Sequence, residues 1–229
     1  MIYIVDTANT EAIAHCNEYY PIAGVTTNPS IIAKENTNFS TLLKKIRQII
    51  GPDKMLHVQA TSEKAEYIVK EAEAIEHLVG GNFYIKIPIT AEGLKAMMQL
   101  KRRGFQITAT ACFTQQQALI AAEAGADFVA PYVNRLDNIG TDGSQVVAEI
   151  VELFRIHGLK TKVLSASFKN VEQVHRVLMA GSHAVTVSPD VLERLIYRPL
   201  TDAAIATFES DWRSVYGDKT VIDLLSDPS

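Results

Sequence analysis

Short apolar stretches and longer amphipathic stretches alternate along most of the chain. The short stretches are rich in β-branched and aromatic residues and are bounded by Gly, Pro or Asn, which is typical of buried strands. We predict strands at residues 2–6, 23–27, 55–60, 83–87, 106–111, 127–132, 162–167 and 183–187. The longer stretches have the helical spacing of apolar residues, which predicts helices near 9–18, 38–50, 63–79, 91–103, 114–124, 143–157, 170–180 and 189–196.

This succession of strand–helix repeats, with no Pro-, Gly- or Ser-rich linker between halves, predicts an α/β fold. We interpret it as a single (β/α)8 TIM barrel domain over residues 1–229. Residues 200–216 predict an added C-terminal helix, and residues 217–229 a polar tail. The alternative is a doubly wound open sheet. We favour the barrel because no G-x-G-x-x-G sequence follows the first strand.

Polar residues recur near the carboxyl end of nearly every predicted strand, while their immediate neighbours are mostly apolar. They are Asp6, Thr26, Asn28, Gln59, Lys86, Thr108, Thr110, Tyr132, Asn134, Ser165 and Ser167. Residues two apart on a strand share a face, so we expect these side chains to point into the barrel. The carboxyl end of a barrel is where enzymes of this fold place their chemistry. The pattern therefore predicts an active site there.

Lys86 lies in the middle of the apolar stretch at 83–88. Burial favours a neutral amine, and moving a lysine pKa from about 10.4 to about 7 requires roughly 4–5 kcal/mol of destabilisation of the cation. A neutral amine attacks carbonyl groups, which predicts Schiff-base chemistry. The alternative is a strand-end lysine that extends its amine to water. Asp6 is the one carboxylate of the set, and we expect substrate or water to separate it from Lys86.

The composition is that of a globular enzyme, with 47% hydrophobic and 21% charged residues. The net charge of −4, and the lack of a Lys/Arg cluster that forms a nucleic-acid patch, argue against a nucleic-acid partner. No apolar run reaches membrane length, and the N-terminus lacks the features of a signal peptide. Cys16 and Cys112 form no CxxC motif, which suits a reducing compartment. We therefore expect a cytoplasmic protein without a membrane partner.

The histidines argue against a metal-dependent mechanism. They are His15, His57, His77, His157, His175 and His183. Since they show neither HxH nor HExxH spacing, we predict no metal site. His57 shares the phase of Gln59 but lies deeper, and we expect a core histidine whose hydrogen bonds are satisfied. We expect Lys169, just past the strand that contains Ser165, to make no phosphate contact.

Five motifs on different predicted strands resemble the small transaldolase family. They are residues 5–7 (Val-Asp-Thr), 23–32 (AGVTTNPSII), 84–93 (YIKIPITAEG), 130–135 (APYVNR) and 165–169 (SASFK). The resemblance runs from residue 2 to about 216, and within the family it is strongest to fructose-6-phosphate aldolases. It implies a class I aldolase without metal or cofactor. It also implies a ring-built homodecamer, in which the C-terminal helix reaches a neighbouring subunit.

The resemblance also implies catalytic roles for individual residues. The Schiff-base lysine of the family falls on Lys86, and the aspartate that assists proton transfer falls on Asp6. Gln59, Thr110 and Tyr132 fall on the positions that hold a catalytic water beside the imine. General acid–base groups of this kind typically contribute 10²–10⁴-fold to a rate.

Substrate-binding roles follow in the same way. Asn28 matches the position that holds substrate hydroxyls, and we place Thr26 with it. The alternative role of Thr26 is turn formation and helix capping around residues 28–29. Arg135 and Ser167 match the phosphate-binding positions of the family. An arginine suits phosphate because its planar fork donates two hydrogen bonds at once.

The sequence leaves the reaction open between two related activities. Gln59 and Tyr132 favour an aldolase that cleaves or forms fructose 6-phosphate from dihydroxyacetone and glyceraldehyde 3-phosphate, since transaldolases of this family carry glutamate and phenylalanine there. The stretches 135–140 and 154–158 look closer to transaldolases, which move a dihydroxyacetone unit between sugar phosphates. A third alternative, a barrel retained for binding or assembly without turnover, is disfavoured by the completeness of the polar set.

Overall fold

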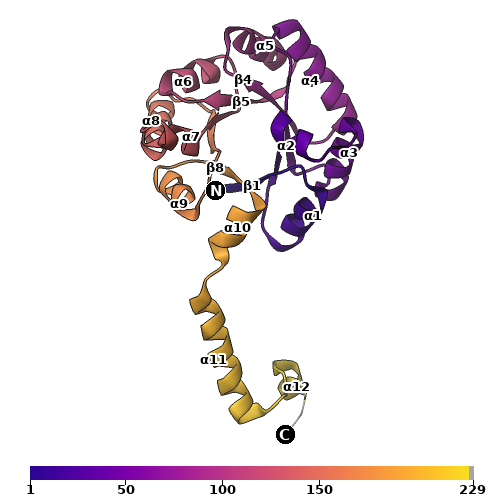
Figure 1. The fold of residues 1–229 in the computed structure, drawn as a ribbon, viewed down its shortest axis with the longest axis vertical. Helices are drawn as coiled ribbons and strands as arrows, with labels where there is room; N and C mark the ends of the chain where they lie inside the picture. Colours follow the sequence, from indigo (N-terminus) through magenta and orange to yellow (C-terminus); the bar gives the residue numbers. More distant parts are fainter. Residues whose placement is uncertain (227–229) are drawn as a thin grey trace. The chain divides into compact units, whose positions relative to one another are not determined.

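The computed structural model describes residues 1–226, and residues 1–192 pack as one unit around a closed parallel barrel. The strands follow one another around the barrel in sequence order, as the view along the barrel in Figure 1 shows. They are β1 (Ile2–Asp6), β2 (Gly24–Thr26), β3 (Met55–Gln59), β4 (Phe83–Pro88), β5 (Gln106–Cys112), β6 (Phe128–Pro131), β7 (Lys162–Ser165) and β8 (Ala184–Val187). The predicted (β/α)8 barrel is confirmed.

Helices surround the barrel, and most of them match the predicted ranges to within a few residues (Figure 1). They are α1 (Thr10–Tyr19), α3 (Phe39–Ile50), α4 (Ala65–Val79), α5 (Ala91–Arg102), α6 (Gln115–Glu123), α8 (Gly143–Ile156), α9 (Val171–Met179) and α10 (Pro189–Ile196). Side-chain caps fix where several of them begin. The oxygens of Asn38, Thr90 and Asp142, for example, accept hydrogen bonds from main-chain N–H groups of α3, α5 and α8.

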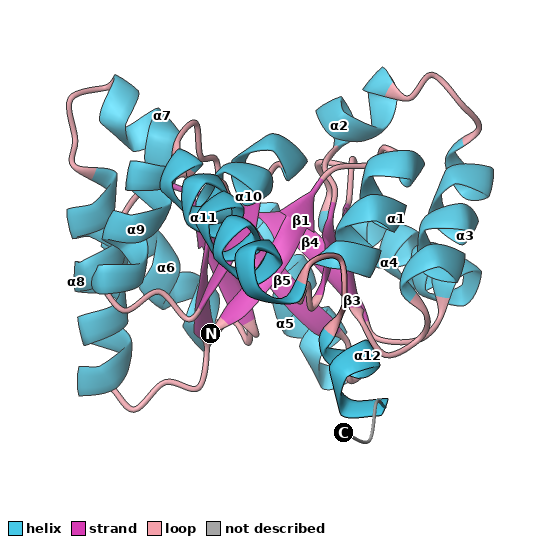
Figure 2. Cartoon of the chain, turned by 90° about the horizontal axis from the view of Figure 1, so that it is seen from below, coloured by secondary structure: helices cyan, strands magenta, loops and turns pink. Residues whose placement is uncertain are grey.

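Two short helices inside the barrel unit were not predicted. They are α2 (Pro29–Lys34) and α7 (Val133–Asn138), and they lie at the same end of the barrel in Figure 2. Helix α2 begins after the N-cap Asn28, whose side chain accepts a hydrogen bond from the Ile31 N–H, with Pro29 in the first helical position. Both helices follow directly on strands, β2 and β6, so they bring additional side chains to the carboxyl end of the barrel.

Apolar side chains fill the amino-terminal part of the barrel interior. The cluster consists of Ile4, Met55, Phe128, Leu164 and Ala184, with Ile2, Ala23 and Tyr84 packed against it. Alternation along the strands places the next inward residues, such as Lys86 two positions after Tyr84, closer to the carboxyl end. The packed layer thus closes one end of the barrel and leaves the polar residues at the other.

The remaining residues, from Glu193 onward, form a second compact unit. It contains the end of α10 together with α11 (Pro199–Tyr216) and α12 (Val221–Ser226). Helix α11 confirms the predicted C-terminal helix. The sequence analysis assigned residues 217–229 to a tail, but α12 lies within this range, and residues 227–229 lie outside the described residues. The grouping of all 229 residues into one domain stays a prediction.

None of the helices within residues 1–226 has both the length and the apolar character to cross a membrane.

Candidate active site

A cavity of about 380 Å³ opens at the carboxyl ends of the strands. Its lining includes eight of the nine residues that the sequence analysis assigned to the site: Asp6, Thr26, Asn28, Lys86, Thr110, Tyr132, Arg135 and Ser167. They come from β1, β2, β4 and β5 and from the segments that follow β2, β6 and β7. The fold therefore gathers side chains that are far apart in the sequence into one polar, concave site.

Lys86 lies in the interior of the barrel on β4 and is 6% exposed. Its Nζ donates a hydrogen bond of 2.6 Å to the main-chain carbonyl oxygen of Thr27. Burial lowers the pKa of the Lys86 amine below its ordinary value, and the negative charge of Asp6 partly opposes this effect. The lysine therefore does not extend to bulk water, which was the alternative considered from the sequence.

Asp6, the last residue of β1, lies on the same cavity. Its Oδ1 accepts a hydrogen bond of 2.7 Å from the Thr26 hydroxyl, which is 2.5 Å from the Thr186 hydroxyl. Burial raises the pKa of the Asp6 carboxyl, whereas the charge of Lys86 and the Thr26 hydrogen bond lower it. Among the ion pairs of the described chain, none joins Asp6 to Lys86. The two groups are therefore not in direct ion-pair contact, and their separation by substrate or water stays a prediction.

Thr27, whose carbonyl accepts the Lys86 hydrogen bond, is itself held in place by His57. The N–H and Oγ1 of Thr27 both donate to the main-chain carbonyl of His57, at 2.9 and 3.1 Å. The imidazole of His57 is fully buried and stacks on the Tyr84 ring, with Nδ1 2.9 Å from the Thr108 hydroxyl. The prediction of a core histidine is correct. The expectation that all of its hydrogen bonds are satisfied is wrong, because His57 Nε2 has no hydrogen-bond partner. Burial and the charge of Lys86 hold the pKa of His57 well below its ordinary value.

Thr110 on β5 and Tyr132, which directly follows β6, form a hydroxyl pair on the cavity. Their oxygens are 2.8 Å apart, and Tyr132 packs edge-on against Phe113. Directly after Thr110, Ala111 has a φ of 56°, and the register between β5 and β6 shifts there. Such a bulge re-aims the chain at the end of a strand. A neutral hydroxyl pair can position a water molecule, since each hydroxyl both donates and accepts.

The backbone brings Ser167 into the cavity by a different route from the one predicted. The sequence analysis placed Ser165 and Ser167 on the same inward face, but β7 ends at Ser165, whose hydroxyl bonds that of Ser182 at 2.7 Å outside the cavity. Ser167 has a φ of 64°, so strand alternation no longer applies to it. The inward placement of Asn134 is also wrong, since Asn134 lies on α7 and its amide oxygen accepts a hydrogen bond from Gln173.

Arg135 is exposed at the mouth of the cavity, and its guanidinium lies 4.7 Å from the centre of the Tyr132 ring. The nearby Asp137 carboxylate accepts hydrogen bonds from the Gly143 N–H and from Gln173 instead. Within residues 1–226 no ion pair to Arg135 is found. Its donors are thus available for an anionic ligand, and stacking on Tyr132 restricts where they point.

Gln59 is the predicted site residue that the cavity does not include. It is the last residue of β3, and its Cα pairs with that of Lys86 across the sheet. Its side chain lines a neighbouring cavity of about 570 Å³ together with Thr61, Ser62 and Thr90. The assignment of Gln59 to a catalytic water stays a prediction.

Several lining residues were not assigned to the site from the sequence: Ser30, Ile31, Lys34, Phe168, Lys169, Thr186 and Ser188. Thr186 was detectable, because it is the inward polar residue of β8 and has the same phase as the other strand-end residues. Lys34 and Ser30 lie on the unpredicted helix α2. Lys169 lines the cavity as well, and the expectation that it makes no phosphate contact stays a prediction.

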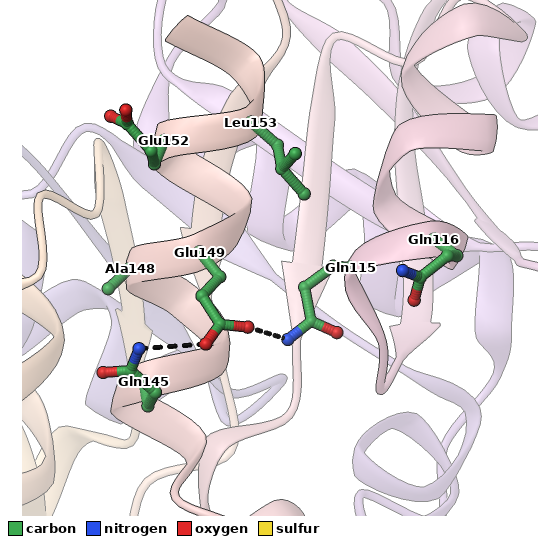
Figure 3. A pocket seen from close by; sticks show the side chains of 7 residues that line it. All are labelled: Gln115, Gln116, Gln145, Ala148, Glu149, Glu152 and Leu153. Carbon is green, nitrogen blue, oxygen red and sulfur yellow. Dashed lines mark hydrogen bonds between the residues drawn. The ribbon is translucent and has the colours of Figure 1, made fainter. Parts of the chain in front are cut away.

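A further hollow, of about 600 Å³, lies between α6 and α8 (Figure 3). Glu149 accepts hydrogen bonds there from the side chains of Gln115 and Gln145. Its lining contains no lysine, cysteine, serine or histidine, so it offers no amine, thiol, hydroxyl or imidazole nucleophile. Within the described part of the chain, no group of three or more His, Cys, Asp or Glu side chains is arranged to hold a metal ion.

Comparison with known structures supports the fold alone. The chain superposes with a TM-score of 0.59 on a structure described as "Native KDPGal structure", at 14% identity over 86% of this chain and 84% of the other. A flavocytochrome b2 variant with sulfite bound gives a TM-score of 0.60 at 13% identity, covering 82% of this chain and 56% of the other.

Comparison with protein sequences gives the family. The family model described as "Transaldolase/Fructose-6-phosphate aldolase" matches residues 3–227. A protein of Streptococcus pneumoniae named "Probable fructose-6-phosphate aldolase" is 40% identical over 96% of this chain and 100% of its own length. A Brevibacillus brevis protein named "Probable transaldolase" is 41% identical over 94% and 99% of the two chains. With a family match over nearly its whole length and relatives of this identity, the chain belongs to the transaldolase/fructose-6-phosphate aldolase family.

Proposed function

We propose that the protein is a class I, Schiff-base aldolase, a lyase that cleaves or forms fructose 6-phosphate from dihydroxyacetone and glyceraldehyde 3-phosphate. The observation that carries the proposal is the position of Lys86, a buried lysine whose amine lies on the cavity at the carboxyl end of the barrel. Its lowered pKa favours the neutral, nucleophilic amine. A barrel retained only for binding has no need for such a costly buried amine.

In the proposed cleavage, the neutral Lys86 amine adds to the C2 carbonyl of the ketose, and water leaves after one proton is taken up from solvent, which gives an iminium ion. The ionised Asp6 then takes the proton of the C4 hydroxyl while the C3–C4 bond breaks. The electron pair of that bond moves to the iminium nitrogen, and glyceraldehyde 3-phosphate departs. The proton that Asp6 took up returns to the resulting enamine at C3, and addition of water then releases dihydroxyacetone, the free amine and the proton taken up when the iminium ion formed. The scheme requires no metal or cofactor.

The other lining residues have assigned roles in this proposal. Thr110 and Tyr132 hold the water that exchanges protons with the imine, which their mutual hydrogen bond supports. Asn28 and Thr26 bind the substrate hydroxyls. Arg135 and Ser167 hold the phosphate at the mouth of the cavity, where the guanidinium has no competing ion pair within residues 1–226.

Transaldolase activity is the second candidate, favoured by relatives at 40–42% identity that are named "Probable transaldolase". The two reactions share the imine and differ in whether an acceptor sugar takes up the enamine. The test is to measure glyceraldehyde 3-phosphate release from fructose 6-phosphate with and without erythrose 4-phosphate. Release without the acceptor supports the aldolase, and release that requires the acceptor makes the protein a transaldolase.

We also propose that the protein is cytoplasmic and assembles as a ring-built homodecamer. Large apolar side chains on the second unit support an assembly, since Leu200, Phe208, Ile222 and Leu225 are between 69% and 84% exposed in the single chain. A helix that reaches a neighbouring subunit accounts for such exposure. Sedimentation of the wild type and of Phe208→Glu tests this, because a charge in a buried contact dissociates the assembly, whereas a monomeric wild type contradicts it.

A further inference from the structure

A chain of hydroxyl groups links β8 to the Asp6 carboxylate through β2. The Thr186 Oγ1 is 2.5 Å from the Thr26 Oγ1, which in turn donates to Asp6 Oδ1 at 2.7 Å. Both threonines are almost fully buried, at 3% and 0% exposure. The three residues lie side by side because β8, β1 and β2 are neighbours in the barrel, and Asp6 and Thr26 pair directly in register.

The direction of these hydrogen bonds follows from the number of available protons. An ionised carboxylate only accepts, so the single hydroxyl proton of Thr26 is committed to Asp6. Thr186 must then donate its own proton to the Thr26 oxygen. Donation to Thr26 polarises the Thr26 hydroxyl and strengthens its bond to the carboxylate, as in other hydrogen-bond chains.

The two oxygens of the Asp6 carboxylate are therefore not equivalent. Oδ1 is occupied by Thr26, whereas no hydrogen bond to Oδ2 is present within residues 1–226. Because the side chain lines the cavity and Oδ2 is not one of the buried unpartnered atoms, Oδ2 is the oxygen that a ligand reaches.

We propose that Thr186 is a positioning residue for the proposed aldol cleavage, acting through Thr26 to hold Asp6 so that Oδ2 receives the C4 hydroxyl proton of the substrate. This inference rests on the proposed function. The proton moves from the substrate oxygen to Oδ2, and Thr186 and Thr26 keep their own protons throughout. The same hydrogen bonds persist before and after the transfer, so the chain holds the carboxyl without consuming a proton.

The groups that face Asp6 make its titration interpretable. The adjacent strands β2 and β8 present only the hydroxyls of Thr26 and Thr186, which do not titrate in the working range. The charged group that acts on Asp6 is Lys86 of β4. Further cations on the cavity are Lys34, Arg135 and Lys169. A Thr186 variant keeps all of these charged side chains. A shift in the acid limb of its pH–rate profile therefore measures the effect of the hydrogen-bond chain on the pKa of Asp6.

The test compares Thr186→Val, which keeps the side-chain shape and removes the hydroxyl, with Thr186→Ser, which keeps the hydroxyl. The matched control is Thr161→Val, since Thr161 is a buried threonine whose hydroxyl donates to the Ala126 carbonyl away from the cavity. For each protein, borohydride trapping of dihydroxyacetone measures imine formation, and the pH profile of fructose 6-phosphate cleavage measures proton transfer.

We expect Thr186→Val to trap the donor within twofold of the wild type but to cleave roughly 10-fold more slowly, part of what general base catalysis contributes. Its acid limb moves to higher pH, because loss of a hydrogen bond that favours the charged form raises the carboxyl pKa. Thr186→Ser restores both. An unchanged rate and acid limb in Thr186→Val, or the same loss in Thr161→Val, overturns the inference. A wild type that traps no ketose overturns the proposed function itself, and the inference with it.

Discussion

The Lys86 amine donates a 2.6 Å hydrogen bond to the carbonyl oxygen of Thr27. The N–H and hydroxyl of Thr27 both donate to the carbonyl of His57, and these two hydrogen bonds hold Thr27 in place. The acceptor is a main-chain group without formal charge, so it fixes the amine without stabilising its cationic form as strongly as a carboxylate does. Because the N–H points to Thr27, the lone pair of the neutral amine points elsewhere. The geometry thus combines a fixed nitrogen with a lowered pKa.

Replacement of Asp6 by asparagine should separate imine formation from bond cleavage. The Asp6 charge raises the pKa of Lys86, so Asp6→Asn lowers it further and the neutral amine persists to lower pH. Trapping of dihydroxyacetone by borohydride should therefore extend to lower pH than in the wild type. Cleavage should fall by roughly 10²–10⁴-fold, because asparagine accepts no proton. A variant that cleaves at the wild-type rate shows that Asp6 is not the base.

Arg135→Ala should weaken the binding of phosphorylated substrates, by roughly 1.5–3 kcal/mol for one charge-assisted contact. Cleavage of the unphosphorylated ketose should change much less, since that substrate makes no contact with the guanidinium. The measurement is kcat/KM for fructose 6-phosphate and fructose, with Arg155→Ala as the control, because Arg155 is exposed on α8 and pairs with Glu152. Equal losses on both substrates make Arg135 a structural residue.

Gln59 and Tyr132 should decide the balance between free cleavage and transfer. A glutamate at residue 59 accepts a proton if burial raises its pKa from about 4.3 toward neutrality, whereas an amide only orients water. Gln59→Glu should therefore raise transaldolase activity relative to cleavage, and Tyr132→Phe should lower free cleavage by removing a water ligand. Both reactions are measured on each variant. If the ratio of transaldolase activity to free cleavage is unchanged in Gln59→Glu, residue 59 does not decide between the two reactions, and its side chain belongs only to the neighbouring cavity.

Glu71 should stabilise the loop between β3 and α4 in a pH-dependent way. Its carboxylate accepts hydrogen bonds from the N–H and hydroxyl groups of Thr61 and Ser62, at 2.6–3.2 Å. Burial alone raises the pKa of Glu71, but the hydrogen bonds from Ser62 and Thr61 outweigh burial and lower it. The contribution of Glu71 to the free energy of unfolding is therefore fully present above the pKa of its carboxyl in the unfolded chain. It is lost as the pH falls through the lower pKa of the folded protein.

We expect Glu71→Gln to destabilise the protein by on the order of 1 kcal/mol at neutral pH, a modest value because the carboxylate is partly exposed and water screens it. Thermal melting of both proteins from pH 7 downward measures the effect, and the difference should shrink below the unfolded pKa of about 4.3. A difference that is independent of pH contradicts the role of the carboxylate charge.

Strand periodicity accounts for the part of the site that the sequence predicted. Asp6, Thr26, Lys86 and Thr110 lie on strands, where alternation fixes which face a side chain takes, and all four face the cavity. Ser167 reaches the cavity although alternation fails for it, because its positive φ comes after β7 has ended. Side chains beyond a strand depend on local backbone angles, which apolar patterning does not reveal.

The short helices show the same limit. Helix α2 has six residues, too few for an apolar period to be recognised, so Ser30 and Lys34 were missed as lining residues. Its start was nevertheless encoded by Asn28 and Pro29, an N-cap residue followed by proline. Gln59 shows the converse, since it has the predicted phase but, at the end of β3, lines a different cavity.

The most direct test of the Schiff-base mechanism is to locate the covalent adduct. The protein is treated with dihydroxyacetone and borohydride, digested, and analysed by mass spectrometry, beside Lys86→Arg and a control, Lys101→Arg, whose surface lysine pairs with Asp127. Arginine keeps the charge but supplies no free amine near neutral pH. We predict a donor-dependent mass increase on the peptide with Lys86 in the wild type and in Lys101→Arg, and neither adduct nor turnover in Lys86→Arg. An adduct on another lysine, or turnover by Lys86→Arg, contradicts the mechanism.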